Sequence, residues 1–255
     1  MEKKRFSFHV NGLPVEAEYD KKNIEQIFIP LLAELNRRFL QKGSRLIVYL
    51  AAPPGTGKTT LVQFLEHLSG SIQGMAGVQA IGLDGFHYSQ DYLDSHEIKK
   101  DGKLVLMKDI KGSPETFDIE KVRKSIHALQ RSDVKWPIYD RTLHDVVPDA
   151  LLVTKDIILI EGNWILLDED GWRELICDSD FSIFITAEER MLKERLIARK
   201  ITGGLTARQA EDFYERSDGK NIRRALSSRL KPDLLLHLQE NGEYTVEGDW
   251  NGEKL

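Results

Sequence analysis

The sequence has very little cysteine and no long apolar segment. A single cysteine, Cys177, among 255 residues excludes an intramolecular disulfide and a cysteine-based metal cluster. No apolar run approaches the roughly 20 residues that a membrane span requires. The first ten residues, MEKKRFSFHV, lack the apolar core of a signal peptide. These absences predict a soluble cytoplasmic protein with no membrane partner.

Positive charge is not in excess either. The formal net charge is −5 at pH 7, and the isoelectric point is about 5.9. We therefore expect neither nucleic acid nor an anionic membrane as the main partner. Hydrophobic residues make up 41% of the chain and charged residues 30%, which is typical of a globular domain with a substantial core.

The N-terminal region shows two different periodicities. Residues 6–19 alternate apolar with polar side chains around an Asn-Gly pair at 11–12, which predicts a β-hairpin. Over residues 24–40 the apolar side chains recur at helical spacing. Pro30 lies inside that pattern, so we expect a kink or a break there.

The rest of the chain alternates short apolar runs with helical stretches. Strands are predicted at 46–51, 78–84, 156–166 and 180–187, with later ones at 233–238 and 244–247, and helices at 58–68, 118–130, 188–200 and 206–216. Runs that are apolar throughout indicate strands buried on both faces, as in a parallel sheet covered by helices. We interpret the chain as α/β, with residues 1–44 added to a main domain over 45–255.

The stretch LIVYLAAPPGTGKTT, residues 46–60, predicts a phosphate-binding loop between a strand and a helix. Ala52 replaces the first glycine of the usual G-x-x-x-x-G-K-[ST] pattern, at the strand exit, where a methyl group is tolerated. The next two residues are prolines and offer no N–H group. The phosphates of ATP are therefore assigned to the following residues, in which Lys58 supplies the cation and Thr59 a hydroxyl for Mg²⁺: Gly55, Thr56, Gly57, Lys58, Thr59 and Thr60.

Two of the predicted strands end in an acidic residue, Asp84 and Glu161. In an open α/β sheet, ligands bind at the carboxyl ends of the strands, so both carboxylates are expected to face the phosphate loop. Phosphoryl transfer to a hydroxyl needs a base for the acceptor proton and a carboxylate near Mg²⁺. We assign the first role to Asp84 and the second to Glu161.

Four stretches in this order resemble the phosphoribulokinase, uridine kinase and type I pantothenate kinase family of P-loop kinases. They are AAPPGTGKTT, LDGFHY, KGSPETFD with PIYDRTLHDVVPDA, and IILIEGNWIL. The likeness is greatest to the nucleoside/nucleotide kinase-like and fructose-transport-associated branch. The resemblance implies a P-loop fold, a catalytic base at Asp84, an acid near the metal at Glu161 and an arginine-bearing lid after the strand that ends in FITA.

The stretch EERMLKERLIARKITGG, residues 188–204, is the predicted lid. Arg195 and Arg199 are four residues apart, so they share one helix face, where their guanidinium groups match phosphate oxygens. The glycine pair at 203–204 would serve as the hinge that lets the lid close and exclude water. We count both arginines as catalytic together with Lys58 and Asp84.

The acceptor pocket is less strongly marked in the sequence. Tyr139 and Asp140 match a pair found in uridine kinases, whereas SPETFD and VVPDA are closer to the pantothenate kinase pattern. The aromatic C-terminal segment of pantothenate kinases is missing. We predict an acceptor site of mainly polar side chains, which suit a sugar or sugar derivative: His87, Tyr88, Tyr139, Asp140, Arg141 and Asn221.

The chain is therefore interpreted as an ATP- and Mg²⁺-dependent kinase of a small hydroxyl-bearing metabolite. A uridine-type or pantothenate-type kinase is the alternative within this reaction. A nucleoside monophosphate (NMP) kinase is a further alternative among enzymes, and it would need no base because its acceptor is a phosphate rather than a hydroxyl. A nucleotide-dependent ATPase switch is the alternative of another class, which the lid and the base carboxylate disfavour. Whether the chain forms a homodimer is left open.

Overall fold

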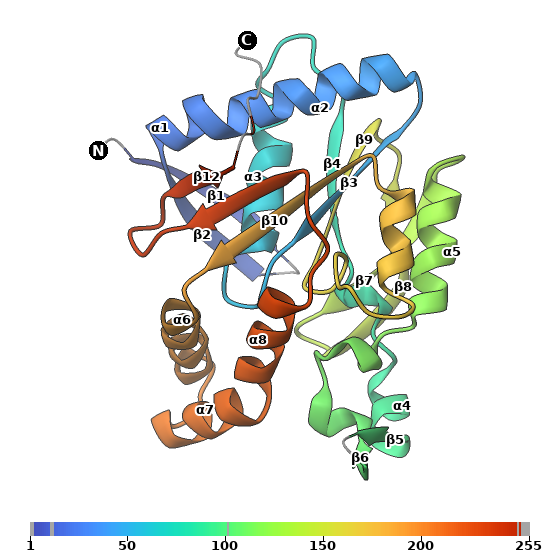
Figure 1. Cartoon of the computed structure of the whole chain (residues 1–255), viewed down its shortest axis with the longest axis vertical. Coiled ribbons are helices and arrows are strands. Elements are labelled where there is room, and N and C mark those ends of the chain that lie inside the picture. Colours follow the sequence, from blue (N-terminus) through green and yellow to red (C-terminus); the bar gives the residue numbers. More distant parts are fainter. Residues whose placement is uncertain (1–2, 11–12, 101, 249, 251–255) are drawn as a thin grey trace.

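The computed structural model describes residues 3–10, 13–100, 102–248 and 250. Its centre is a six-stranded sheet, in which all pairs of neighbouring strands are parallel except β11 with the edge strand β12. Figure 1 shows this sheet between layers of helices. In spatial order the strands are β12 (Tyr244–Glu247), β11 (Leu234–Leu238), β10 (Phe181–Ala187), β3 (Leu46–Ala51), β9 (Ile157–Gly162) and β4 (Val78–Gly82).

The observed helices include most of those predicted from the sequence, together with others. They are α1 (Lys21–Asn23), α2 (Ile29–Lys42), α3 (Lys58–Ser69), α4 (Gln90–Ser95), α5 (Ile119–Leu129), α6 (Glu189–Thr202), α7 (Ala207–Phe213) and α8 (Gly219–Ser227). Short 3₁₀ turns are η2 (Asp84–Phe86), η3 (Met107–Ile110), η4 (Pro114–Thr116) and η5 (Arg173–Asp178), and π-helical turns are η1 (Ile24–Phe28) and η6 (Tyr214–Asp218).

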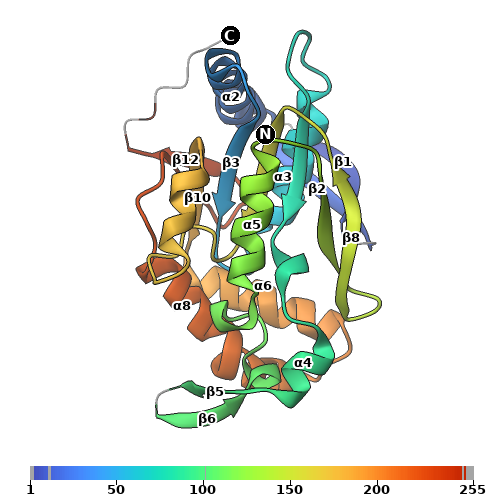
Figure 2. The ribbon, with the colours of Figure 1, turned by 90° about the vertical axis from the view of Figure 1, so that its right-hand side faces the viewer.

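Three separate two-stranded antiparallel ribbons complete the fold. They are β1 (Lys3–Val10) with β2 (Leu13–Asp20), β5 (Glu97–Lys100) with β6 (Lys103–Leu106), and β7 (Val134–Asp140) with β8 (Asp145–Val153). The first confirms the predicted hairpin, although its Asn-Gly turn lies outside the described residues. Figure 2 shows the β5–β6 ribbon beside α4 at the end of the molecule away from α2.

The sheet is buried on both faces, as its continuous apolar strands predict. Alternate residues of one strand face opposite layers: Val48 packs with α2 and α3, whereas Ile47 and Tyr49 pack with α5 and the β7–β8 ribbon. In β3 and β9 every residue is buried. This three-layer arrangement confirms the α/β fold and places the loops at the carboxyl ends of the parallel strands on one edge.

Several details of the prediction were wrong. Strand β12 runs antiparallel to β11, so the sheet is not wholly parallel. The strand expected to reach residue 166 ends at Gly162, and the helix expected over 206–216 gives way to a π-helical turn after Phe213. Helix α8 and the ribbons β5–β6 and β7–β8 were not predicted, because their segments are rich in charged residues or interrupted by Pro137.

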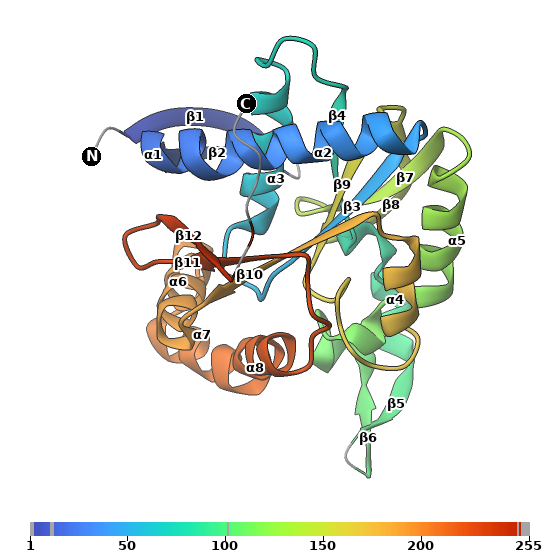
Figure 3. The same cartoon turned by 45° about the horizontal axis from the view of Figure 1, so that its top comes forward.

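The predicted break at Pro30 takes a milder form. The helical path continues from α1 through η1 into α2, and Pro30 is the second residue of α2. The π-helical turn just before it, in which Ile29 donates its N–H to the carbonyl of Ile24, absorbs the distortion. A single long rod therefore crosses the molecule beside the hairpin (Figure 3).

Aromatic side chains tie the hairpin and this rod to α3. The Phe64 ring of α3 lies 4.1 Å from the Tyr19 ring, 4.8 Å from Phe6 and 5.6 Å from Phe28, measured between centroids. Phe64 is fully buried. Because α3 begins at Lys58, this cluster holds the middle of the helix whose first residue belongs to the phosphate loop.

We predict that Phe64→Ala lowers the free energy of unfolding by about 3–5 kcal/mol, since it leaves a cavity among three other rings. Urea-induced unfolding measures the loss. Leu40→Ala on neighbouring α2, where the side chain is 68% exposed, is the control and should change stability by less than about 0.5 kcal/mol. Equal losses in the two variants would show that the cluster does not anchor α3.

Candidate active site

The loop between β3 and α3 has the backbone of a phosphate-binding loop. Gly55 and Gly57 adopt positive φ angles of 91° and 80°, which favour glycine. The Thr56 side chain is buried, and its hydroxyl donates to the carbonyl oxygen of Pro53 at 3.0 Å. Thr56 thus secures the turn with its side chain, so that only its backbone N–H remains for a ligand. Ala52 is fully buried at the strand exit, which explains why a methyl group fits there.

A buried carboxylate lies directly behind this loop. Glu161 is the fifth residue of β9 and is in register with Leu50 of β3. Its Oε1 accepts a hydrogen bond from the Thr59 hydroxyl at 2.8 Å, and its Oε2 is 4.0 Å from Lys58 Nζ. Burial raises the pKa of Glu161, while the charge of Lys58 opposes that rise. The first two residues of α3 are therefore linked to the centre of the sheet.

Asp84 follows the neighbouring strand, β4, at the start of η2. The next residue, Gly85, lies against β7 so closely that a Cβ atom there would be 2.2 Å from the carbonyl oxygen of Pro137. The short turn that carries Asp84 is thus held between β4 and the β7–β8 ribbon. This packing fixes the direction in which the chain leaves the strand.

A cavity of about 480 Å³ lies between the phosphate loop, Asp84 and helix α6. It is lined by Val15, Pro54, Gly55, Gly57, Lys58, Thr59, Thr60, Asp84, Arg141, Asn163, Arg195, Leu196 and Arg199. Most of the predicted nucleotide-binding and catalytic residues therefore share one cavity. We call it the phosphate-loop cavity.

Four cationic side chains face this cavity from three elements. Lys58 comes from the phosphate loop, Arg195 and Arg199 from α6, and Arg141 from the turn between β7 and β8. Partial loss of hydration and the nearby charge of Arg141 lower the pKa of Arg199, and Asp218 and Asp84 oppose that shift. Asp84 is the one acid among the lining residues, so the cavity has an excess of positive charge that suits a polyphosphate.

Of the residues predicted to bind the acceptor, Arg141 lines the phosphate-loop cavity and the others do not. The His87 ring packs at 3.8 Å on Phe117, and its Nδ1 lies 3.2 Å from the carbonyl oxygen of Thr116. Burial lowers the pKa of His87, while the charge of Asp84 opposes this. The Tyr88 ring stacks at 4.5 Å on Tyr92.

Two further candidates lie in strand β7, and one lies elsewhere. The Tyr139 hydroxyl accepts a hydrogen bond from Lys111 Nζ at 3.1 Å. Asp140 Oδ1 accepts from the backbone N–H groups of residues 142 and 143 at 2.7 and 3.0 Å, which caps the turn. Asn221 lines a second, separate cavity. Their role toward an acceptor stays a prediction.

Two residues of the phosphate-loop cavity were not predicted as site residues. Asn163 directs a buried Oδ1 that finds no hydrogen-bond partner anywhere in the described part of the chain. Its place two residues after Glu161 was the signal that could have identified it. Val15 reaches the cavity from the N-terminal hairpin. No local pattern reports that contact, because it depends on how the hairpin packs against α3.

The donor set beside the loop suits a hard divalent cation. Mg²⁺ prefers oxygen ligands and usually takes only one or two from the protein, completing its shell with phosphate and water. The Thr59 hydroxyl and the Glu161 carboxylate provide such a pair. Within the ranges that the structure describes, no group of three or more His, Cys, Asp or Glu side chains could hold a metal alone. Any Mg²⁺ at this site would therefore be shared with the nucleotide.

Comparison with known proteins adds independent evidence. The model of the phosphoribulokinase / uridine kinase family matches residues 47–214. The chain belongs to this family. It is 42% identical to the Escherichia coli K12 protein YggC, which is described as uncharacterized, over 92% of this chain and 96% of that one. It is 26% identical to a Schizosaccharomyces pombe protein described provisionally as a uridine kinase, over 77% of this chain and 85% of that one.

A solved structure agrees with this membership. The crystal structure from Silicibacter sp. TM1040 that is described provisionally as a fructose transport system kinase has a TM-score of 0.70 and 31% sequence identity. The match covers 80% of this chain and 98% of that one. The chain is therefore an ATP-dependent phosphotransferase with a P-loop kinase fold, and its substrate is a small molecule. No helix among the described residues is long and apolar enough to cross a bilayer.

We predict that Thr59→Val raises the Mg²⁺ concentration needed for half-maximal activity by roughly tenfold, the lower end of the range for lost metal-site partners. The substitution keeps the shape of the side chain and removes the hydroxyl that bonds Glu161. Thr60→Val is the matched control, since Thr60 is assigned to phosphate through its backbone N–H. An unchanged Mg²⁺ titration in Thr59→Val would contradict the assignment.

Proposed function

We propose that this kinase transfers the γ-phosphate of ATP to a hydroxyl of a small polyhydroxylated acceptor, a sugar or sugar derivative. The observation that carries the proposal is the presence of Asp84 in the same cavity as the phosphate loop and three arginines. A carboxylate placed opposite a polyphosphate site is what transfer to a hydroxyl needs, because the acceptor must lose a proton.

The residues divide into two sides of the reaction. On the nucleotide side, the N–H groups of residues 55–60 bind the phosphates, and Lys58 stabilises the charge that develops between the β- and γ-phosphates. Arg195 and Arg199 reach the same groups from α6, which we propose as part of the lid over 188–204. Their forked donors hold the transferred group in line without covalent chemistry.

On the acceptor side, Asp84 receives the proton of the attacking hydroxyl. The acceptor oxygen forms a bond to the γ-phosphorus as the bond from that phosphorus to the β–γ bridging oxygen breaks, and ADP leaves. Thr59 and Glu161 would hold Mg²⁺, which when bound neutralises charge on the phosphate oxygens. We also propose that residues 1–44 are an addition to the kinase domain over 45–255. Val15 of this addition lines the phosphate-loop cavity on the nucleotide side.

The composition of the phosphate-loop cavity supports a sugar over a nucleoside. Asp84, Arg141 and Asn163 can make paired hydrogen bonds to neighbouring hydroxyl groups. None of the lining residues, all of which are described, is an aromatic that could stack on a base. A uridine-type or pantothenate-type acceptor is the alternative. A nucleotide-dependent switch would not need Asp84 in this position.

We predict that Asp84→Asn lowers kcat by about 10²- to 10⁴-fold while ATP affinity stays near that of the parent, because the amide keeps the shape but cannot accept the proton. Steady-state kinetics and ATP titration separate the two effects. Asp91→Asn, an exposed position in the first turn of α4, is the control. Loss of ATP affinity with kcat unchanged would mean that Asp84 serves the nucleotide.

The acceptor class is tested by ADP release with ketoses, aldoses, uridine, cytidine and pantothenate side by side. We predict the highest kcat/KM for a sugar, since buried polar groups left unpaired cost about 1–3 kcal/mol each. A tenfold or greater advantage for uridine or pantothenate would refute the sugar assignment and leave the kinase reaction intact. ADP release that needs no acceptor would favour the ATPase switch.

A further inference from the structure

A second cavity, of about 440 Å³, opens between the β5–β6 ribbon and the start of α8. It is lined by Lys100, Lys103, Val105, Asp109, Ile110, Ser113, Arg216, Ser217, Lys220 and Asn221. We call it the lysine pocket. Its residues come from segments more than a hundred positions apart, so the fold brings them together around one space.

The lysine pocket gathers positive charge in a chain whose net charge is −5. Its lining contains three lysines and one arginine against a single acid, Asp109. Lys100 pairs with Glu115 at 3.4 Å. In the described ranges, no ion pair involves Lys103, Arg216 or Lys220. Like charges around one cavity repel one another, and an anion in the cavity removes that cost.

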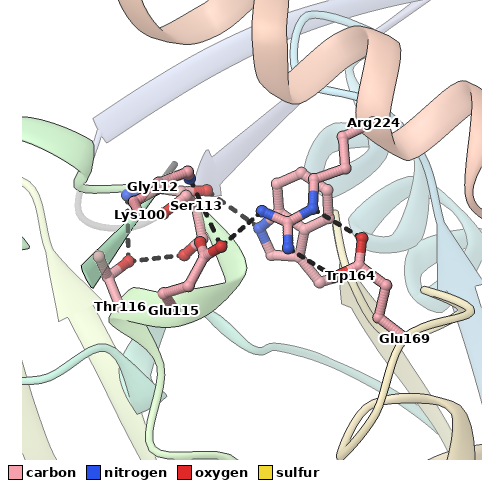
Figure 4. A network of polar contacts seen from close by, with 8 residues as sticks. All are labelled: Lys100, Gly112, Ser113, Glu115, Thr116, Trp164, Glu169 and Arg224. Carbon is pink, nitrogen blue, oxygen red and sulfur yellow. Dashed lines mark hydrogen bonds and ion pairs between the residues drawn. The ribbon is translucent and has the colours of Figure 1, made fainter. Parts of the chain in front are cut away.

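A network of hydrogen bonds lies beside the lysine pocket. Ser113 is 3% exposed, and two residues later Glu115 Oε1 accepts from Arg224 Nη1 at 2.8 Å. Arg224 also donates to both oxygens of Glu169, at 2.8 and 2.5 Å, which links α8 to the turn after β9 (Figure 4). Burial alone would raise the pKa of Glu115, but Ser113 and Arg224 overcome it and lower that pKa to about 2. Glu115 is therefore ionised, and its charge is paired with Arg224.

The lysine pocket lies close to the phosphate-loop cavity, although no residue lines both. On one side, Trp164 Nε1 donates to the carbonyl oxygen of Gly112 at 3.0 Å. The residue before Trp164, Asn163, lines the phosphate-loop cavity, and the residue after Gly112, Ser113, lines the lysine pocket. Chain neighbours of one hydrogen-bonded pair thus line the two cavities on this side.

On the other side, Lys200 Nζ lies 3.3 Å from Asp218 Oδ2. Arg199 precedes Lys200 and lines the phosphate-loop cavity, whereas Ser217 precedes Asp218 and lines the lysine pocket. The two cavities therefore adjoin at the Trp164–Gly112 bond and at the Lys200–Asp218 pair.

We propose that the lysine pocket is an anion subsite for the acceptor, so that the acceptor carries a phosphate or carboxylate group at the end remote from the hydroxyl that is phosphorylated. This inference rests on the proposed kinase reaction. Lys103, Arg216 and Lys220 bind the oxyanion, and Asn221 donates to it or to a nearby hydroxyl. Val105 and Ile110 contact the carbon chain between the two ends. The phosphates of ATP have their own cavity, which leaves these cations for the second substrate.

The test compares matched acceptors: D-ribose, D-ribose 5-phosphate and D-ribonate, and D-fructose, D-fructose 6-phosphate and D-gluconate. We expect the anionic members of a set to have the higher kcat/KM, and the phosphate and carboxylate arms show which oxyanion is preferred. In the double variant Lys103→Gln, Lys220→Gln that advantage should fall about tenfold or more, as expected for the loss of a charged contact. The KM for ATP and the rate with a neutral sugar should stay within about twofold, since the phosphate loop is untouched.

The matched control is Lys124→Gln, Lys135→Gln, which removes the same charge from exposed positions of α5 and β7 outside both cavities. Direct binding of the anionic probes, by calorimetry with a non-hydrolysable ATP analogue present, gives a readout independent of turnover. Binding that is lost only in the Lys103, Lys220 variant supports the subsite.

Anionic probes that bind or react equally well in the parent, the test variant and the control variant overturn the subsite, and a sugar kinase without it would remain. Conversely, probe binding that needs Lys103 and Lys220, together with ADP release that needs no acceptor, would uphold the subsite and reject the kinase reaction. The two failures therefore give different results.

Discussion

The hydrogen bond between Thr59 and Glu161 determines how the helical layer meets the sheet. A carboxylate at the end of a fully buried strand is costly unless polar partners surround it. Thr59 and Lys58 are those partners, so the requirement of the acid fixes the first turn of α3 against β9. The aromatic cluster around Phe64 then fixes the other half of the same helix. Between these two attachments the phosphate loop has little freedom to shift relative to the strands.

The remaining parts of the site are arranged around that fixed loop on two sides. Asp84 and Arg141 come from η2 and the β7–β8 turn, which pack on each other at Gly85 and Pro137. Arg195 and Arg199 come from α6, which with α7 and α8 forms a separate group of helices below the sheet (Figure 3). The lysine pocket is lined both by Ser113, just before η4, and by Lys220 of α8. A ligand in both cavities would contact both sides at once.

Local patterns were sufficient for the parts of the fold that obey one rule. The apolar runs of β3, β9 and β10 and the Gly-Lys-Thr turn predict buried strands and a phosphate loop with no knowledge of distant residues. Strand β7 was not predicted because Pro137 interrupts it and its pairing register shifts there. Helix α8 was not predicted because only one narrow face of it is apolar. Asn221 was grouped with Asp84 as a polar residue, but packing places it in the lining of the lysine pocket. Such separations depend on tertiary structure, which no spacing in the sequence reports.

The absence of a side chain at Gly85 has a consequence for reading related sequences. Its φ angle is not among the positive ones, so the residue is small because the Pro137 carbonyl oxygen occupies the place of a Cβ atom. The glycine of the D-G-F triplet therefore marks the neighbouring ribbon rather than any ligand. A chain of this fold with alanine or a larger residue after the acid would have to carry its ribbon farther from the sheet, with a wider entrance beside the position of Asp84. That one position can therefore sort relatives by the width of this entrance before any of their structures is known.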